Sequence, residues 1–201
     1  MFNMAFVMHH YSIIIAKIGI VIILELAINS NIVQSQSWIS NYNEVNFTSG
    51  NSDLPSNFVE SLTLTTDGAL WIGTIEGLAR FHHQQWQVFT PDNSPLLGKI
   101  IQTLTSTPDG ALWIGNFSIS GRTGGGLVRF HQQQWQIFTP DNSPLPSNNV
   151  QALTSTPDGA LWIGTSGPAG GAGGGLTRFY KQQWQVFTPD NSPLPGKDVQ
   201  T

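Results

Sequence analysis

The sequence contains no cysteine among its 201 residues. Disulfide bonds, thiol nucleophiles and cysteine-ligated zinc are therefore excluded for this chain. The absence does not fix the compartment, because a cysteine-free chain is compatible with an oxidising environment as well as a reducing one.

Charge is also scarce, since charged residues make up 10% of the chain against about 25% in an ordinary soluble domain. The polar surface is left to Gln, Asn, Ser and Thr. The net charge is −4, so the chain lacks the basic footprint of a nucleic-acid-binding protein, and we expect no nucleic-acid partner.

A long hydrophobic run is missing too. The stretch 13–28 is apolar except for Lys17 and Glu25, and its uncharged centre covers only 18–24. A bilayer span needs about 20 apolar residues, whereas a secretory signal needs a short apolar run after a basic residue. We predict that residues 1–35 are a signal peptide or N-terminal hydrophobic leader, which implies a periplasmic or secreted protein. The alternatives are a membrane anchor that is not cleaved and a start assigned upstream of the true one.

The sequence does contain a repeat. The string D-G-A-L-W-I-G occurs three times, starting at Asp67, Asp109 and Asp158. Each copy is followed by G-L-x-R-F and then by W-Q-V/I-F-T-P-D-N-S-P-L, and the tryptophan that opens the last string recurs every 49 residues. A repeat of this length indicates stacked supersecondary modules.

One repeat unit predicts four short strands, at residues 58–64, 69–73, 78–81 and 86–90, because apolar and polar residues alternate there. The T-T-D-G or T-P-D-G string before the second strand predicts a turn. No helical pattern follows residue 35. Four antiparallel strands with aromatic residues and a period in the forties predict an all-β fold made of β-propeller blades.

The repeat boundaries divide the chain. We assign 36–57 to the outer-strand remnant of a preceding blade and 198–201 to the start of a further blade. The three full blades are assigned to residues 58–99, 100–149 and 150–197. Because closed propellers use about 4–8 blades, three full blades with partial units at both ends predict an incomplete or open propeller.

The strings L-W-I-G-T, G-L-x-R-F, W-x-x-F-T and N-S-P-L-P-x-N-x-V-Q-A-L closely resemble the two-component regulator propeller repeat over residues 47–201. The resemblance implies the extracytoplasmic sensor region of bacterial hybrid histidine kinases, whose input on one branch is a carbohydrate breakdown product. The family usually has D-G after R-F. Here His82–His83, His131–Gln132 and Tyr180–Lys181 stand in that place, so the shape of this turn is in question.

Blade topology predicts where the loops lie. The glycine-rich inserts 116–126 and 165–175 should share one end of the blades with the D-N-S-P loops, while the P-D-G turns and the turns after R-F lie at the other end. Loops on a rigid scaffold tend to carry binding residues. We therefore predict a ligand site near Asn116, Phe117, Ser118, Arg122 and Thr123. The alternative is that the inserts have no function.

Residues present in every unit are expected to serve the blade itself. The two tryptophans per unit predict core or inter-blade packing, and the alternative for any exposed tryptophan is stacking on a sugar ring. The arginine of each R-F pair is expected either to bind an anion or to pair with a repeated acid, for which the sequence suggests Asp92, Asp141 and Asp190. No catalytic constellation, metal-ligand set or cofactor motif is present, so we expect no catalytic residue, metal or cofactor.

The sequence thus predicts a non-enzymatic extracytoplasmic sensor, a fragment of a larger receptor, that binds a small molecule such as a carbohydrate, or a protein. Unpaired strand edges also predict homo-oligomerisation. Two alternatives stay open. One is a propeller lyase or hydrolase with a metal near the central channel, although Glu60 is the only acid on the predicted innermost strands. The other is a non-functional truncated remnant.

Overall fold

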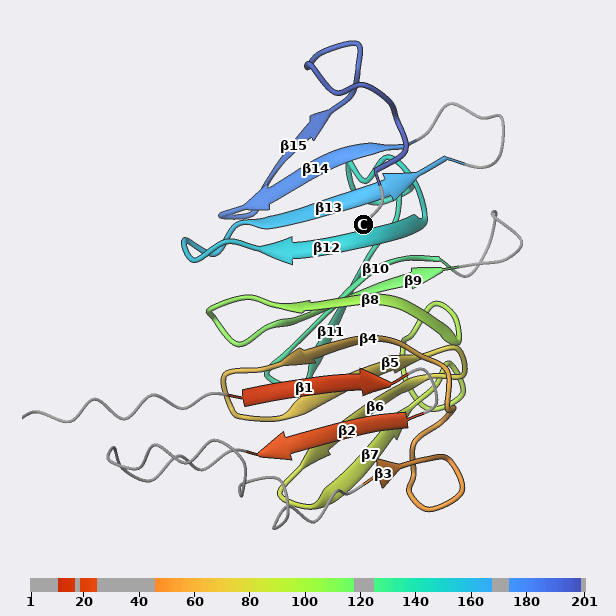
Figure 1. Ribbon diagram of the computed structural model, residues 1–201. Coiled ribbons are helices and arrows are strands. Elements are labelled where there is room, and N and C mark those ends of the chain that lie inside the picture. Colours follow the sequence, from red (N-terminus) through yellow and green to blue (C-terminus); the bar gives the residue numbers. More distant parts are fainter. Residues whose placement is uncertain (1–10, 17–18, 25–45, 118–124, 168–173, 200–201) are drawn as a thin grey trace, which may run out of the picture. The chain divides into compact units, whose positions relative to one another are not determined.

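The computed structural model describes residues 11–16, 19–24, 46–117, 125–167 and 174–199. From Asp53 onward the chain forms one compact unit. This unit contains three four-stranded antiparallel sheets, each a simple meander in chain order (Figure 1). The described residues contain no helix, and the all-β fold of four-stranded blades predicted from the sequence is confirmed.

The strand limits follow the predicted ones within one or two residues. Blade 1 contains β4 (Val59–Leu64), β5 (Leu70–Thr74), β6 (Leu78–His82) and β7 (Gln85–Phe89). Blade 2 contains β8 (Ile100–Ser106), β9 (Leu112–Phe117), β10 (Gly126–His131) and β11 (Gln134–Phe138). Blade 3 contains β12 (Asn149–Ser155), β13 (Leu161–Ser166), β14 (Gly175–Tyr180) and β15 (Gln183–Phe187).

The segment Met1–Ser52 is a second compact unit. Its described strands are β1 (Tyr11–Ala16), β2 (Gly19–Leu24) and β3 (Asn46–Phe47), which pair antiparallel in that order. The first two strands fall within the predicted leader, and β3 falls within the predicted outer-strand remnant. The signal peptide itself stays a prediction. No described residue belongs to a helix long and apolar enough to cross a membrane.

Strand register gives each blade two different faces. In blade 1, Trp71 lies opposite Arg80, and Arg80 lies opposite Gln87 on the next strand. Because side chains alternate along a strand, the neighbouring row points the other way and consists of Leu70, Phe81 and Trp86. We call these rows the tryptophan–arginine face and the phenylalanine–tryptophan face; blades 2 and 3 repeat both.

The blades pack with the tryptophan–arginine face of one against the phenylalanine–tryptophan face of the next. Trp71 is 2% exposed; its ring stacks on Phe89 of its own blade at 5.7 Å and meets the edge of Phe130 of blade 2 at 5.6 Å. Trp113 makes the same two contacts one blade later, with Phe138 and Phe179. The predicted inter-blade role of these tryptophans is confirmed.

The first strands β4, β8 and β12 lie side by side (Figure 1). Glycine in each W-I-G string makes this close approach possible: a Cβ on Gly73 would lie 3.0 Å from the carbonyl oxygen of Ile101. Serine hydroxyls also link neighbouring first strands, since Ser106 donates to the Leu64 carbonyl and Ser155 donates to the Ser106 carbonyl, both at 2.7 Å. These contacts hold the blades in a fixed mutual position.

Candidate functional site

A groove opens at each of the two blade junctions. Groove 1–2, between blades 1 and 2, has a volume of about 730 Å³. Groove 2–3, between blades 2 and 3, has a volume of about 720 Å³. Both are lined by P-D-G turns and by the turns that follow R-F, as the topology predicted when it placed these turns at one end of the blades.

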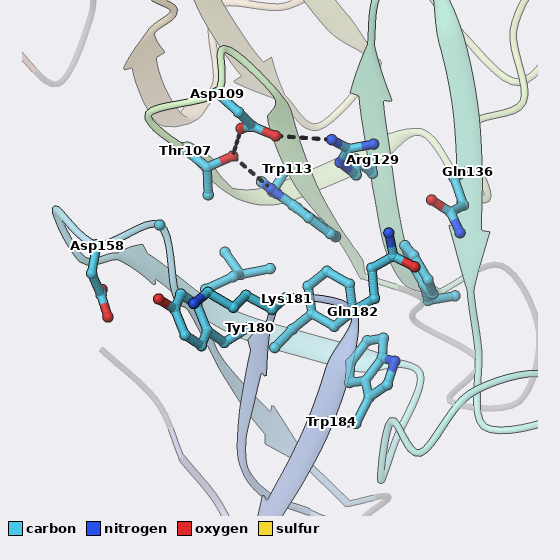
Figure 2. Close-up of a pocket in the computed structure, with 14 residues that line it drawn as sticks. Thr107, Asp109, Trp113, Arg129, Gln136, Asp158, Tyr180, Lys181, Gln182 and Trp184 are labelled. Atoms are coloured by element: carbon cyan, nitrogen blue, oxygen red, sulfur yellow. Dashed lines mark hydrogen bonds and ion pairs between the residues drawn. The ribbon is translucent and has the colours of Figure 1, made fainter.

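The two walls of a groove come from the two kinds of blade face. In groove 2–3, Figure 2 shows Trp113, Arg129 and Gln136 of blade 2 on one side. Blade 3 supplies the other side with Tyr180, Lys181, Gln182 and Trp184. The floor is apolar, because Phe138 is 7% exposed and Leu161 is fully buried. The groove therefore combines aromatic surface with a polar rim.

A chain of hydrogen bonds fixes the rim. The Trp113 indole N–H donates to Thr107 Oγ1 at 3.1 Å, and the Thr107 hydroxyl donates to Asp109. Arg129 Nη2 donates to the other oxygen of Asp109 at 3.0 Å (Figure 2). The same chain occurs in blade 1 through Trp71, Thr65, Asp67 and Arg80. Fully partnered polar groups of this kind give a rigid, preorganised surface.

The prediction that each strand arginine pairs with Asp92, Asp141 or Asp190 is wrong. Arg80 and Arg129 pair with the turn aspartates at 2.9 and 3.0 Å, and Arg178 pairs with Asp158 at 3.9 Å. The reason is strand register: the arginine lies opposite the tryptophan of the second strand, and that strand begins directly after the P-D-G turn. Asp190 instead pairs with Lys197 at 3.5 Å.

Two opposing effects act on the pKa of Asp67. Burial is the largest single effect and raises it, but hydrogen bonds from Thr65, the Ala69 N–H and Arg80, with the charge of Arg80, together outweigh burial and lower the pKa to about 2. The pKa of Asp109 is lowered by the equivalent set of partners against the same opposition from burial. In Asp158, the Thr156 hydroxyl is the main cause of a lowered pKa. These carboxyls are therefore ionised at neutral pH.

The lowered pKa predicts a loss of stability in acid. A carboxyl with a depressed folded-state pKa stabilises the fold at pH values above its unfolded pKa, and this contribution disappears as pH falls through the folded value. For Asp67 the window runs from its ordinary value of 3.8 down to about 2. Urea unfolding at several pH values in that window should show a smaller pH dependence for Asp67→Asn than for the unchanged chain. Equal slopes would contradict the pairing.

The turns after R-F adopt an unusual backbone conformation. Gln132 and Gln133 have φ of 49° and 63°, and Lys181 and Gln182 have the same two values. Positive φ at both central residues defines a type I′ hairpin turn, which favours Asn-Gly or Gly-Gly. Long polar side chains stand there instead, and all four line a groove. His83 and Gln84 of blade 1 adopt the same conformation without lining either groove, so the turn is a feature of every blade, and its position at a junction brings these side chains into the grooves.

The predicted ligand residues lie elsewhere. Asn116 is fully buried, and its amide donates to the carbonyls of Gly98 and Ile100 at 2.9 and 3.4 Å, so it anchors the loop that leads into β8. Phe117 is half-buried at the end of β9. Ser118, Arg122 and Thr123 lie outside the described residues. The ligand role of this set stays a prediction.

Sequence reasoning missed the grooves because it expected the repeated side chains to serve the blade itself, with a binding role only as the alternative for the arginines and for an exposed tryptophan. The available signal was the spacing itself: with a two-residue turn that begins one residue after R-F, the arginine aligns with the glutamine after the second tryptophan. His82 and His131 are also accounted for locally, since Nε2 of each lies 3.1 Å from the carbonyl oxygen of a turn aspartate. Among the residues that the structure describes, no group of three potential metal ligands occurs.

The fold and the repeated grooves define an array of β-propeller blades. Residues 53–76 and 144–167 match the model of the family described as "two component regulator propeller". These two stretches match the repeat of that family, and the resemblance found in the sequence is confirmed. No curated protein matches the sequence.

Solved structures with the same fold include the extracellular domains of two hybrid two component systems from B. thetaiotaomicron. The first is 21% identical with a TM-score of 0.66 and covers 92% of this chain and 22% of its own. The second is 21% identical with a TM-score of 0.54 and covers 88% and 20%. This chain thus spans about a fifth of the length of either.

An enzyme shares the fold as well. Virginiamycin B lyase from Staphylococcus aureus is 16% identical with a TM-score of 0.50, over 70% of this chain and 43% of the lyase chain. At these identities the likeness concerns the fold alone, and function has to be argued from the grooves.

Proposed function

We propose that this chain is a non-enzymatic, extracytoplasmic sensor module that recognises a neutral, hydroxyl-rich ligand, such as an oligosaccharide, in its inter-blade grooves. The observation that carries the proposal is the repetition of one groove at both junctions, with the same aromatic floor and the same partnered polar rim. The extracytoplasmic placement rests on the family repeat and on the predicted leader at residues 1–35.

The groove chemistry fits a sugar better than an apolar or a strongly charged ligand. An aromatic ring such as Trp184 offers a flat apolar face to the C–H side of a pyranose, while Gln136 and Gln182 offer amide donors and acceptors to its hydroxyls. The carboxylate of Asp109 is already neutralised by Arg129. A ligand without net charge can therefore enter without leaving a charge unpaired.

The same geometry argues against a glycosidase-like reaction. A general acid needs a carboxyl whose pKa is raised toward the working pH. The groove carboxyls have lowered pKa values, about 2 for Asp67, and they are held by arginine partners. They can orient hydroxyl groups but cannot supply a proton near neutral pH.

Self-association through open strand edges stays a prediction.

A thermal-shift screen with neutral oligosaccharides tests the proposal. A ligand that binds only the folded state raises Tm, by an amount that corresponds to about 2.7 kcal/mol when its concentration is 100 times Kd. We expect at least one oligosaccharide to raise the Tm of the chain. A screen in which none does so would contradict the proposed ligand class and leave a protein partner as the remaining candidate.

The hairpin turns provide a matched set of variants for that screen. The double change Gln133→Gly and Gln182→Gly removes two groove side chains, and Gln84→Gly removes the equivalent side chain of blade 1, which lines neither groove. Glycine tolerates positive φ, so all these variants should keep or raise the stability of the free chain. We expect the ligand-induced rise in Tm to persist in the Gln84 variant and to shrink in the double variant.

A further inference from the structure

The two grooves are alike except at two hairpin positions and at Thr66, which lines groove 1–2 and has no counterpart in groove 2–3. In both grooves the preceding blade contributes its turn aspartate and the indole of its first tryptophan. The following blade contributes the phenylalanine of R-F and its second tryptophan. At the hairpin of the following blade, groove 1–2 has His131 and Gln132, whereas groove 2–3 has Tyr180 and Lys181. The volumes are nearly equal, so the difference is chemical.

In groove 1–2 the histidine at these positions is held by local hydrogen bonds, and the glutamine is uncharged. His131 Nε2 lies 3.1 Å from the Asp109 carbonyl oxygen, and its Nδ1 lies 3.2 Å from Arg129 Nη2. This arrangement suits a neutral ring that donates from Nε2 and accepts at Nδ1. Gln132 adds no charge, so the charges that line groove 1–2 are one arginine and two aspartates.

Groove 2–3 contains a lysine whose described charge contact is with an aromatic ring and not with a carboxylate. Lys181 is exposed, and its Nζ lies 5.1 Å from the centre of the Tyr180 ring. It forms no ion pair with any residue that the structure describes. Figure 2 shows its amine beside Tyr180 in the groove, with Asp158 further along the rim. Asp158 is engaged at 3.9 Å by Arg178, whose guanidinium also lies over the Tyr180 ring at 4.6 Å.

We propose that the two grooves are separate saccharide sites of unequal specificity, in which groove 1–2 takes a neutral sugar unit and groove 2–3 prefers a unit with a carboxylate, held by Lys181. The inference rests on the proposed function and adds the number of sites and the residue that distinguishes them. A single solvent-exposed charge pair gives a preference of about two- to fivefold.

Two tryptophan indole N–H signals in NMR spectra report the grooves separately. Trp135 lines groove 1–2 and Trp184 lines groove 2–3, and both rings are half-buried. The probes are galactose, galacturonic acid, glucose and glucuronic acid, titrated at neutral pH. We expect both signals to shift with a neutral sugar, and the Trp184 signal to shift at a two- to fivefold lower concentration of the corresponding acid.

Exchange variants at the second of the two differing hairpin positions separate charge from shape. Lys181→Gln should abolish the preference of groove 2–3 for the acid, and Gln132→Lys should create it in groove 1–2. Gln132 and Lys181 both have φ of 49°. Each substitution therefore places on this backbone conformation a residue type that already adopts it in the other blade. Preferences that are equal in both grooves, or unchanged by these variants, would overturn the inference.

The Tm screen and the NMR titrations together distinguish failure of this inference from failure of the proposed function. If an oligosaccharide raises Tm but neither indole signal responds to any of the four sugars, the proposed ligand class stands, and the placement of the ligand in the grooves, on which both proposals depend, is wrong. If the screen and the titrations are both negative, both proposals fall.

Discussion

Replacing Trp113 by alanine is expected to lower the free energy of unfolding by about 3–5 kcal/mol. The side chain is 2% exposed at the junction of blades 2 and 3. Its removal leaves a cavity beside Phe138 and Phe179, which its ring contacts at 5.8 and 5.5 Å. It also removes the indole donor to the Thr107 hydroxyl. Urea unfolding followed by far-UV circular dichroism measures the loss.

The repeat supplies a matched control at the same position of blade 3. Trp162 is half-buried and stacks on Phe187 at 5.9 Å. No described blade covers its outer side, so no inter-blade aromatic contact of the kind made by Trp113 is present there. We expect Trp162→Ala to cost less than half as much as Trp113→Ala. Equal losses would show that the tryptophans stabilise their own blades and not the junctions.

Replacing Gly73 by alanine should also destabilise the chain, by about 1–3 kcal/mol, because it overpacks a junction. The added Cβ would lie 2.5 Å from Ser61 Oγ, 2.7 Å from Ile101 Cγ2 and 3.0 Å from the Ile101 carbonyl oxygen. The last contact is with backbone, so strand β8 itself has to move away from blade 1.

Gly196→Ala is the control for this change. A Cβ at Gly196 meets nothing within 4 Å, and surface substitutions of this kind usually stay within about 0.5 kcal/mol. Thermal unfolding of the two variants gives the comparison. A Gly73 variant as stable as the Gly196 variant would mean that the first strands are not in close contact.

The blades could be predicted because their signals are local. Alternation of apolar and polar residues gives the strands, proline and glycine in T-P-D-G give the turn, and an exact repeat gives the module. The partner of each arginine could not be predicted, because it depends on the register between strands. That register depends on a type I′ turn formed by residues such as Gln132 and Gln133, whose types do not indicate positive φ.

The candidate site was harder still. The inserts differ between the repeat units, and for this reason the sequence predicted the ligand site at Asn116 and the inserts. The Asn116 amide instead donates to the Gly98 carbonyl and holds a neighbouring loop. The grooves consist of repeated residues, and repetition suggests packing. Trp113 shows why both descriptions hold: its side chain is 2% exposed between the blades, and it also lines a groove. Only coordinates reveal that a junction leaves space at one end.

The most direct test of the account is a crystal structure of the chain with the saccharide that raises its Tm most. The account predicts density for the sugar in a blade junction, against Trp135 or Trp184 and within hydrogen-bonding distance of the groove glutamines. Density at the opposite end of the blades, beside Phe117, with both grooves free of sugar, would contradict it.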